Sequence, residues 1–184
     1  MRRIVKKLSA KELSARAAKI KILILDVDGV MTDGGIIFDN NANELKVFNV
    51  KDGHGIKMLH KAGIGVAIIT GRKSKVVAQR AKELGIKDVY QGFKVKTDAL
   101  EKILNKYGLR KYEAAFVGDD VIDIPVFFNV GLAVAVSDAV AEAKAAAHHI
   151  TKCSGGKGAV REVCELILRS SGKWKALLDV YYKV

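Results

Sequence analysis

The stretch Ile22-Leu23-Ile24-Leu25-Asp26-Val27-Asp28-Gly29-Val30 decides how this sequence folds. A run of apolar residues ends abruptly in two carboxylates spaced i, i+2, and a glycine follows them. The apolar run predicts a buried parallel strand, and open α/β sheets bind their ligands at the carboxyl edge of such strands. Two acids at that edge repel each other unless a cation or a shared proton relieves the repulsion. The stretch therefore predicts a metal-assisted active site.

The rest of the chain alternates between predicted strands and predicted helices. Strands are predicted at 21–26, 64–70, 88–91, 114–117 and 132–136, and helices at 9–19, 55–62, 74–84, 97–107, 123–129, 138–147, 158–170 and 173–181. Two short β-rich runs, 34–38 and 44–48, flank an Asn/Asp turn and predict a hairpin. Such alternation is typical of a parallel sheet with right-handed crossovers. We expect an α/β fold: a Rossmann-like, doubly wound parallel sheet with a protruding β-hairpin and no separate cap domain, in a single domain over 1–184.

Composition indicates a single packed domain and argues against membrane-spanning, secreted and nucleic-acid-binding proteins. The 184 residues are 49% hydrophobic, which is enough for one packed domain. The sequence lacks a run of eighteen apolar residues and a secretory h-region, so we expect neither a membrane span nor a signal peptide. Cys153 and Cys164 are expected to be reduced thiols of a cytoplasmic protein. The net charge of +12 is spread along the chain without an aromatic-studded basic stripe, so neither nucleic acid nor a membrane is the expected partner.

Reactive side chains follow three of the predicted strands. Asp26 and Asp28 follow the first, Thr70-Gly71-Arg72 ends the second, and Gly118-Asp119-Asp120 ends the strand at 114–117. Lys96 precedes the helix at 97–107. Because the ends of parallel strands share one rim of the sheet, we expect these groups to converge.

Carboxylates, a hydroxyl and an ammonium on one rim suit phosphoryl transfer. Asp26 and Asp119 could share a Mg²⁺ ion, Asp26 could attack phosphorus, and Asp28 could exchange protons with the leaving oxygen and the water. Thr70 and Lys96 could hold the phosphoryl oxygens. Taken singly, a strand-end Asp more often caps a helix and a Lys is more often solvated. The order and placement of the groups together favour the phosphoryl-transfer interpretation.

This combination resembles the haloacid dehalogenase-like phosphatase superfamily over residues 21–169. The matching pieces are Asp26-Val27-Asp28-Gly29-Val30, Thr70-Gly71-Arg72, Lys96 and Gly118-Asp119-Asp120-Val121-Ile122-Asp123. The resemblance implies that Asp26 is the nucleophile and Asp28 the general acid and base. It also implies that Asp26, the backbone carbonyl of Asp28 and Asp119 hold the metal.

A narrower resemblance, carried by residues 33–35, 49–53, 71–74 and 155–162, is to the 3-deoxy-D-manno-octulosonate 8-phosphate phosphatases of lipopolysaccharide synthesis. It implies a phosphorylated sugar acid as substrate and a homotetramer. The substrate-binding residues that it implies by matching position are Asp28, Asn49, Val50, Lys51, Asp52, Gly53, Lys57, Thr70, Gly71, Arg72, Arg80 and Lys96. Lys51, His54 and Lys157 depart from the family pattern, which has Arg, often Tyr, and Arg at these positions.

Other functions remain open at this point. The alternatives are a phosphatase of another sugar acid such as a sialic-acid 9-phosphate, a non-catalytic oligomerisation module, and a signalling receiver domain. A receiver takes phosphate on an Asp after a later strand, whereas here the Asp-x-Asp pair follows the first strand of the motif. Intact acids and Lys96 argue against an inert module.

The C-terminal segment carries an apolar stripe. Trp174, Leu177, Leu178 and Tyr181 fall at i, i+3, i+4 and i+7, which is one face of a helix. One interpretation is that this face docks on the chain's own core. The other, which the resemblance implies, is that the tail reaches a neighbouring subunit and helps to close its site.

Overall fold

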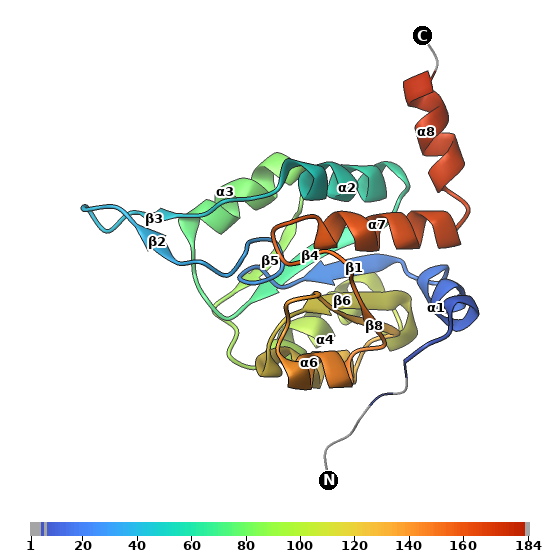
Figure 1. Cartoon of the computed structure of the whole chain (residues 1–184), viewed down its shortest axis with the longest axis horizontal. Helices are drawn as coiled ribbons and strands as arrows, with labels where there is room; N and C mark the ends of the chain where they lie inside the picture. The colour runs from blue at the N-terminus through green and yellow to red at the C-terminus, as the bar shows by residue number, and fades with distance from the viewer. Residues whose placement is uncertain (1–4, 6, 183–184) are drawn as a thin grey trace.

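A six-stranded sheet forms the centre of the computed structural model, which describes residue 5 and residues 7–182 (Figure 1). Its strands are β1 Ile22–Leu25, β4 Gly65–Thr70, β5 Asp88–Gln91, β6 Ala114–Gly118, β7 Leu132–Ala135 and β8 His149–Ile150. Their order in the sheet is β5-β4-β1-β6-β7-β8, and every neighbouring pair is parallel. The predicted doubly wound parallel sheet is confirmed. Because the chain moves outward from β1 in both directions, the order reverses between β1 and β6, which is where such folds bind ligands.

Helices cover both faces of this sheet (Figure 1). The helices α2 Val50–Lys61, α3 Lys75–Leu84 and α7 Ala159–Ser170 lie on one face, and α4 Lys96–Tyr107 and α6 Ala141–Ala146 on the other. The remaining helical elements are α1 Ala10–Ala17, α5 Ile124–Phe127, α8 Trp174–Tyr182 and the 3₁₀ turns η1 Lys111–Glu113 and η2 Val121–Asp123. The strands β1, β6 and β7 are buried along their whole length, as their unbroken apolar sequences predict.

Helix starts follow from side-chain caps. Ser9 accepts from the Glu12 amide, and the Glu12 side chain accepts from the Ser9 amide, so the two residues form a capping box at the start of α1. The prediction that the second helix begins at Gly55 is wrong: α2 begins at Val50, with Asn49 accepting from the amides of Lys51 and Asp52. Glycines at positions 53 and 55 weaken a helix locally, but tertiary packing demands small residues there. A Cβ at position 53 would lie 2.5 Å from Arg80, and one at position 55 would lie 3.3 Å from the Arg161 backbone.

The predicted hairpin projects away from the body of the molecule (Figure 1). Its strands, β2 Ile37–Phe38 and β3 Glu44–Leu45, are antiparallel and shorter than predicted. Large apolar side chains are exposed along it, namely Ile36, Ile37, Phe38, Leu45 and Val47. The described residues contain no second domain over the sheet edge, so the absence of a separate cap domain is confirmed for that part of the chain.

The C-terminal helix α8 stands away from the sheet (Figure 1). Trp174 and Leu177 pack against the core, whereas Tyr181 is half-exposed and contacts His54 and Lys61 of α2. Docking on the chain's own core therefore accounts for the first half of the predicted stripe.

Among the described residues, no helix is long and apolar enough to cross a bilayer. Cys153 and Cys164 are free thiols, and His149 begins β8.

Candidate active site

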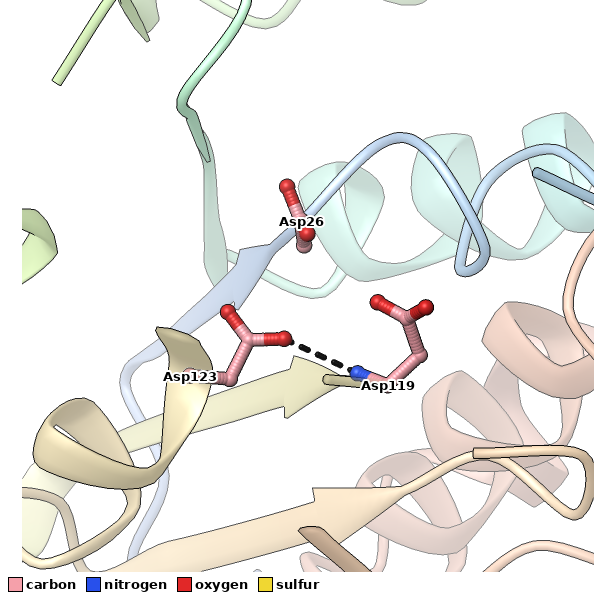
Figure 2. A group of neighbouring side chains, drawn as sticks. All are labelled: Asp26, Asp119 and Asp123. Carbon is pink, nitrogen blue, oxygen red and sulfur yellow. Dashed lines mark hydrogen bonds between the residues drawn. The ribbon is translucent and has the colours of Figure 1, made fainter. Parts of the chain in front are cut away.

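Two strand ends build the centre of the site at the point where the strand order reverses. Asp26 follows β1 directly, and Asp119 follows β6. Figure 2 shows these two side chains and Asp123 gathered beyond the carboxyl ends of the two strands. One oxygen from each of the three carboxylates lies within 4.8 Å of the others. The predicted convergence of Asp26 and Asp119 is confirmed, and Asp123 joins them.

The carboxylates are buried enough to perturb their proton affinity. Burial is the main cause that raises the pKa of Asp26 to about 6, with Lys96 opposing it and Asp123 adding to it. Burial, followed by the charges of Asp26 and Asp123, raises the pKa of Asp119 to about 7. Without a cation the cluster therefore tends to hold protons near neutral pH. Such a cluster favours a bound cation, because the cation removes the repulsion that the protons otherwise relieve.

The donor set fits a small hard cation. Carboxylate oxygens are the ligands that Mg²⁺ prefers, and Mg²⁺ usually takes one or two carboxylates from the protein and keeps several waters. Gly29, which follows Asp28, approaches this cluster closely: a Cβ at position 29 would lie 2.1 Å from Asp119 Oδ2. Glycine is therefore required beside the carboxylate, and its φ of +85° also favours glycine.

Lys96 forms ion pairs with two of the three carboxylates. It starts α4, its side chain is 1% exposed, and its Nζ lies 2.8 Å from Asp26 Oδ2 and 2.7 Å from Asp123 Oδ1. Burial alone lowers the pKa of Lys96, but the two carboxylates outweigh burial and raise it. The ammonium is therefore charged and held against the Asp26 carboxylate.

Thr70 and Arg72 bring the end of β4 to the same pocket. Thr70 is 3% exposed, and its hydroxyl accepts from the Arg72 amide at 3.4 Å, so its proton can be donated elsewhere. A pocket of about 240 Å³ opens here. The described residues that line it are Asp26, Asp28, Gly34, Thr70, Gly71, Arg72, Asp119, Asp120 and Ile122. The structure thus brings together most of the groups that the strand-end motifs predict.

Asp28 lies at the mouth of the pocket. Its Oδ1 accepts from Lys46 Nζ, and Arg72 Nε lies 3.6 Å from its Oδ2. The Asp28 side chain remains 23% exposed, so it is accessible to a ligand. Lys46 belongs to the end of the hairpin and was not among the predicted site residues.

A second group of predicted substrate-binding residues lies on α2 and α3, outside this pocket. Asn49 caps α2, and Asp52 is buried with its Oδ1 accepting from the Arg161 amide at 2.7 Å. Arg80 and Val50 border a different pocket of about 320 Å³, and Arg80 stacks over Phe48 at 5.6 Å. Three more predicted residues, Lys51, Gly53 and Lys57, also lie on α2. Within a single chain, none of these seven residues lines the pocket at Asp26.

Sequence reasoning missed Asp123 and Lys46 as members of the site. Asp123 is fully buried; its Oδ1 accepts from Lys96, and its Oδ2 accepts from the Asp119 amide at 2.9 Å (Figure 2). Its place at the end of the piece 118–123, which carries part of the family resemblance, was a signal. Lys46 carried no comparable signal, since its partner Asp28 lies eighteen positions away along the chain.

Comparison with known proteins places the chain among phosphatases. The haloacid dehalogenase-like hydrolase family matches residues 36–131. The 3-deoxy-D-manno-octulosonate 8-phosphate phosphatase of Escherichia coli K12 is 49% identical over 162 residues, which are 88% of this chain and 86% of that protein.

Solved structures agree with these sequence matches. The crystal structure of the same phosphatase from Yersinia pestis is similar with a TM-score of 0.89 and 48% identity, covering 91% of this chain and 90% of that one. The phosphatase of Moraxella catarrhalis, solved with a magnesium ion, a phosphate ion and a KDO molecule, has a TM-score of 0.92 and 39% identity. That comparison covers 94% of this chain and 99% of the other.

Proposed function

Because this chain belongs to the haloacid dehalogenase-like hydrolases, we propose that it hydrolyses 3-deoxy-D-manno-octulosonate 8-phosphate to the free sugar acid and phosphate, with Mg²⁺ as cofactor. The reaction belongs to lipopolysaccharide synthesis. The observation that carries this proposal is the buried cluster of Asp26, Asp119 and Lys96 at the β1/β6 switch point, in a chain 49% identical to phosphatases of that name. A cytoplasmic location, expected from the two free thiols, stays a prediction.

The residues of the rim divide the chemistry between them. Asp26 would attack phosphorus with a carboxylate oxygen, forming an aspartyl phosphate as the bond to the sugar oxygen breaks. Lys96 holds Asp26 in place at 2.8 Å and adds positive charge beside the phosphoryl group. Thr70 would donate its hydroxyl proton to a phosphoryl oxygen. When bound, Mg²⁺ would withdraw charge from the phosphoryl oxygens and lessen their repulsion of Asp26.

Asp28 would act first as acid and then as base. In the first half-reaction it gives its proton to the departing sugar oxygen. In the second it takes a proton from water, whose oxygen attacks phosphorus and releases phosphate from Asp26. The partly exposed carboxylate at the pocket mouth can reach both the leaving oxygen and solvent.

Metal ligation is assigned to Asp26 and Asp119, with the Asp28 backbone carbonyl as the third protein ligand that the family pattern implies. Asp123 already accepts bonds with both carboxylate oxygens, from Lys96 and from the Asp119 amide. We therefore assign Asp123 to holding Lys96 and the Asp119 loop in place.

We further propose a homotetramer. The hairpin exposes Ile36, Phe38, Leu45 and Val47, each more than half exposed, and a two-stranded hairpin is marginal on its own. Lys57 and Arg80 do not line the pocket at Asp26 in their own chain, and we propose that they contact substrate from a neighbouring copy. Packing the hairpins of several copies together would both bury these side chains and roof the sites. Light scattering at micromolar concentration tests this, and a monomer would refute it.

Substrate preference tests the proposed activity. Arg72 at the pocket mouth, and Lys51, Lys57 and Arg80 from a neighbour, offer charge for an anion besides the phosphate. One charge-assisted hydrogen bond contributes about 1.5–3 kcal/mol, so kcat/KM should favour the octulosonate ester over glucose 6-phosphate by roughly 10–100-fold or more. The activity should also disappear with EDTA and return with Mg²⁺. Comparable kcat/KM for the two esters would contradict the assignment of substrate.

A further inference from the structure

Four charged side chains form a closed ring at the pocket mouth. Asp28 contacts Lys46 through Oδ1 and Arg72 through Oδ2, the second at 3.6 Å. Glu44 Oε1 lies 3.3 Å from Lys46 Nζ and 2.9 Å from Arg72 Nη2. Each acid therefore faces both bases, and each base faces both acids. Half of the ring, Glu44 and Lys46, belongs to the hairpin, and the other half belongs to the loops after β1 and β4.

The sequence of the hairpin's return strand points these two charges inward. Along residues 44–48 the side chains alternate, as in any extended strand, between two faces. Glu44, Lys46 and Phe48 are partly buried, whereas Leu45 and Val47 are exposed. In most half-buried strands the apolar side chains face inward and the polar ones outward. Here the inward positions 44 and 46 carry charged side chains, and the outward positions 45 and 47 carry apolar ones. An inward Lys that is only 1% exposed is costly unless its charge is matched, and here Asp28 and Glu44 match it.

Glu44 also joins the hairpin to the segment after β4. The hydroxyl of Ser74, the N-cap of α3, donates to the Glu44 carboxylate and is the main cause that lowers the pKa of Glu44, with Lys46 and Arg72 adding to the effect and burial opposing it. The ring therefore connects the hairpin, the Asp28 loop and the start of α3. Apolar contacts would be enough to attach the hairpin to the body of the chain. Instead, the hairpin is attached through Asp28 and Arg72, the two members of the ring that line the pocket.

We infer that Lys46 and Glu44 are positioning residues for the reaction, Lys46 for Asp28 and Glu44 for Arg72. This inference rests on the proposed function. Lys46 holds one carboxylate oxygen of Asp28, which leaves the other turned toward Arg72 and the pocket mouth. Glu44 holds the guanidinium of Arg72 beside the pocket. The hairpin thereby supplies to its own chain's site the orienting contacts that a larger enzyme could take from a cap domain.

The first test is a double-mutant cycle between positions 46 and 28, measured as turnover of the octulosonate ester at high enzyme concentration. Lys46→Met should lower kcat by roughly 10–100-fold, since a small misplacement of a catalytic group has effects of this size. In an Asp28→Asn background the same change should have no further effect, because Lys46 acts through Asp28. Lys46→Arg should restore part of kcat, and Lys11→Met on the exposed face of α1 should leave it unchanged.

The outcomes of this cycle distinguish a failure of the positioning role from a failure of the proposed activity. Unchanged kcat in Lys46→Met, or equal losses from that change in the wild-type and Asp28→Asn backgrounds, overturns the positioning role while the proposed activity stands. An inactive wild-type enzyme would reject the proposed function instead. If thermal melting shows that Lys46→Met does not fold, Glu44→Gln tests the inference instead. This variant should raise KM by about tenfold and change kcat less than threefold, because one oriented charge-assisted bond to Arg72 is lost. A fall in kcat with unchanged KM in that variant would overturn the role of Glu44.

Discussion

Asp123 offers the sharpest test of how the site is built, because its substitution by Asn removes a charge and keeps the shape. The carboxylate accepts from the Lys96 ammonium at 2.7 Å with one oxygen and from the Asp119 and Asp120 amides, at 2.9 and 3.3 Å, with the other. An Asn side chain has one oxygen and one NH₂ group, so it can accept either from Lys96 or from the two amides, but not from both sides. In either orientation its NH₂ group faces a donor, and the residue is fully buried.

The expected loss follows from the hydrogen bonds on one side of the carboxylate. Leaving a hydrogen bond to a charged group unmade in the interior costs about 1.5–3 kcal/mol, and breaking a buried ion pair costs about 3–5 kcal/mol. Asp26 still pairs with Lys96 at 2.8 Å, so the full loss of an ion pair does not apply. We expect Asp123→Asn to lower the free energy of unfolding by about 3 kcal/mol. For a chain of this length that corresponds to a fall in Tm of roughly 6–12 °C.

The assay is urea and thermal unfolding with Mg²⁺ chelated, so that ligand binding does not shift the apparent stability. Asp120→Asn is the matched control: Asp120 is partly exposed and caps η2 by accepting from the Val121 amide, which an Asn side chain can also do. That variant should lose less than about 0.5 kcal/mol. A loss below about 1 kcal/mol for Asp123→Asn, or equal losses for both variants, would refute the reasoning from buried donors.

Three further predictions concern chemistry, pH and the tail. Asp26→Asn should lower kcat by at least ~10³-fold, because an amide is a poor nucleophile and a poorer metal ligand; near-normal turnover would reject the mechanism. His148 accepts from the Ala133 amide and faces Arg16, and burial is the main cause that lowers its pKa to about 4. Because the unfolded imidazole titrates near 6.5, the unfolded state binds more protons between pH 6.5 and 4, and stability should fall as pH falls through that window. With the partly exposed ring discounted for solvent screening, the loss should be about 1.5 kcal/mol, and His148→Gln should remove it in urea titrations at pH 7 and pH 4.5. Removing residues 173–184 should leave the chain folded but change KM or kcat, whereas a large fall in Tm with unchanged kinetics would show that α8 only docks on its own core.

Local sequence was enough to predict the strands and the residues at their ends. An unbroken apolar run such as 22–25 has one stable location, the interior of a sheet covered on both faces. Once the alternation of strands and helices predicts a parallel sheet, Asp26, Thr70 and Asp119 must share its carboxyl rim, whatever the details of packing. That is why the centre of the site could be located without coordinates.

The start of α2 shows where local reasoning fails. The low helix propensity of glycine favours a start after position 53, as predicted, but Arg80 and the backbone of α7 approach positions 53 and 55 closely, at 2.5 Å and 3.3 Å from a Cβ built there, which favours glycine within the helix. The energy gained by packing α2 on α7 outweighs the weak local preference. A partner more than a hundred residues away cannot be recognised from the residues of α2 alone.

Only the tertiary structure decided how the charges are paired. The sequence contains Glu44 and Lys46 in a short strand, Asp28 after β1 and Arg72 after β4, with no feature that joins them. It likewise contains Asp123 without showing that one carboxylate serves both Lys96 and the Asp119 amide. The attraction between two charges depends on a few ångströms of separation and on how far water is excluded, and neither quantity is a property of a local stretch of sequence. The strand-end motifs therefore determine which groups reach the rim, and the folded chain determines which partner each group meets there.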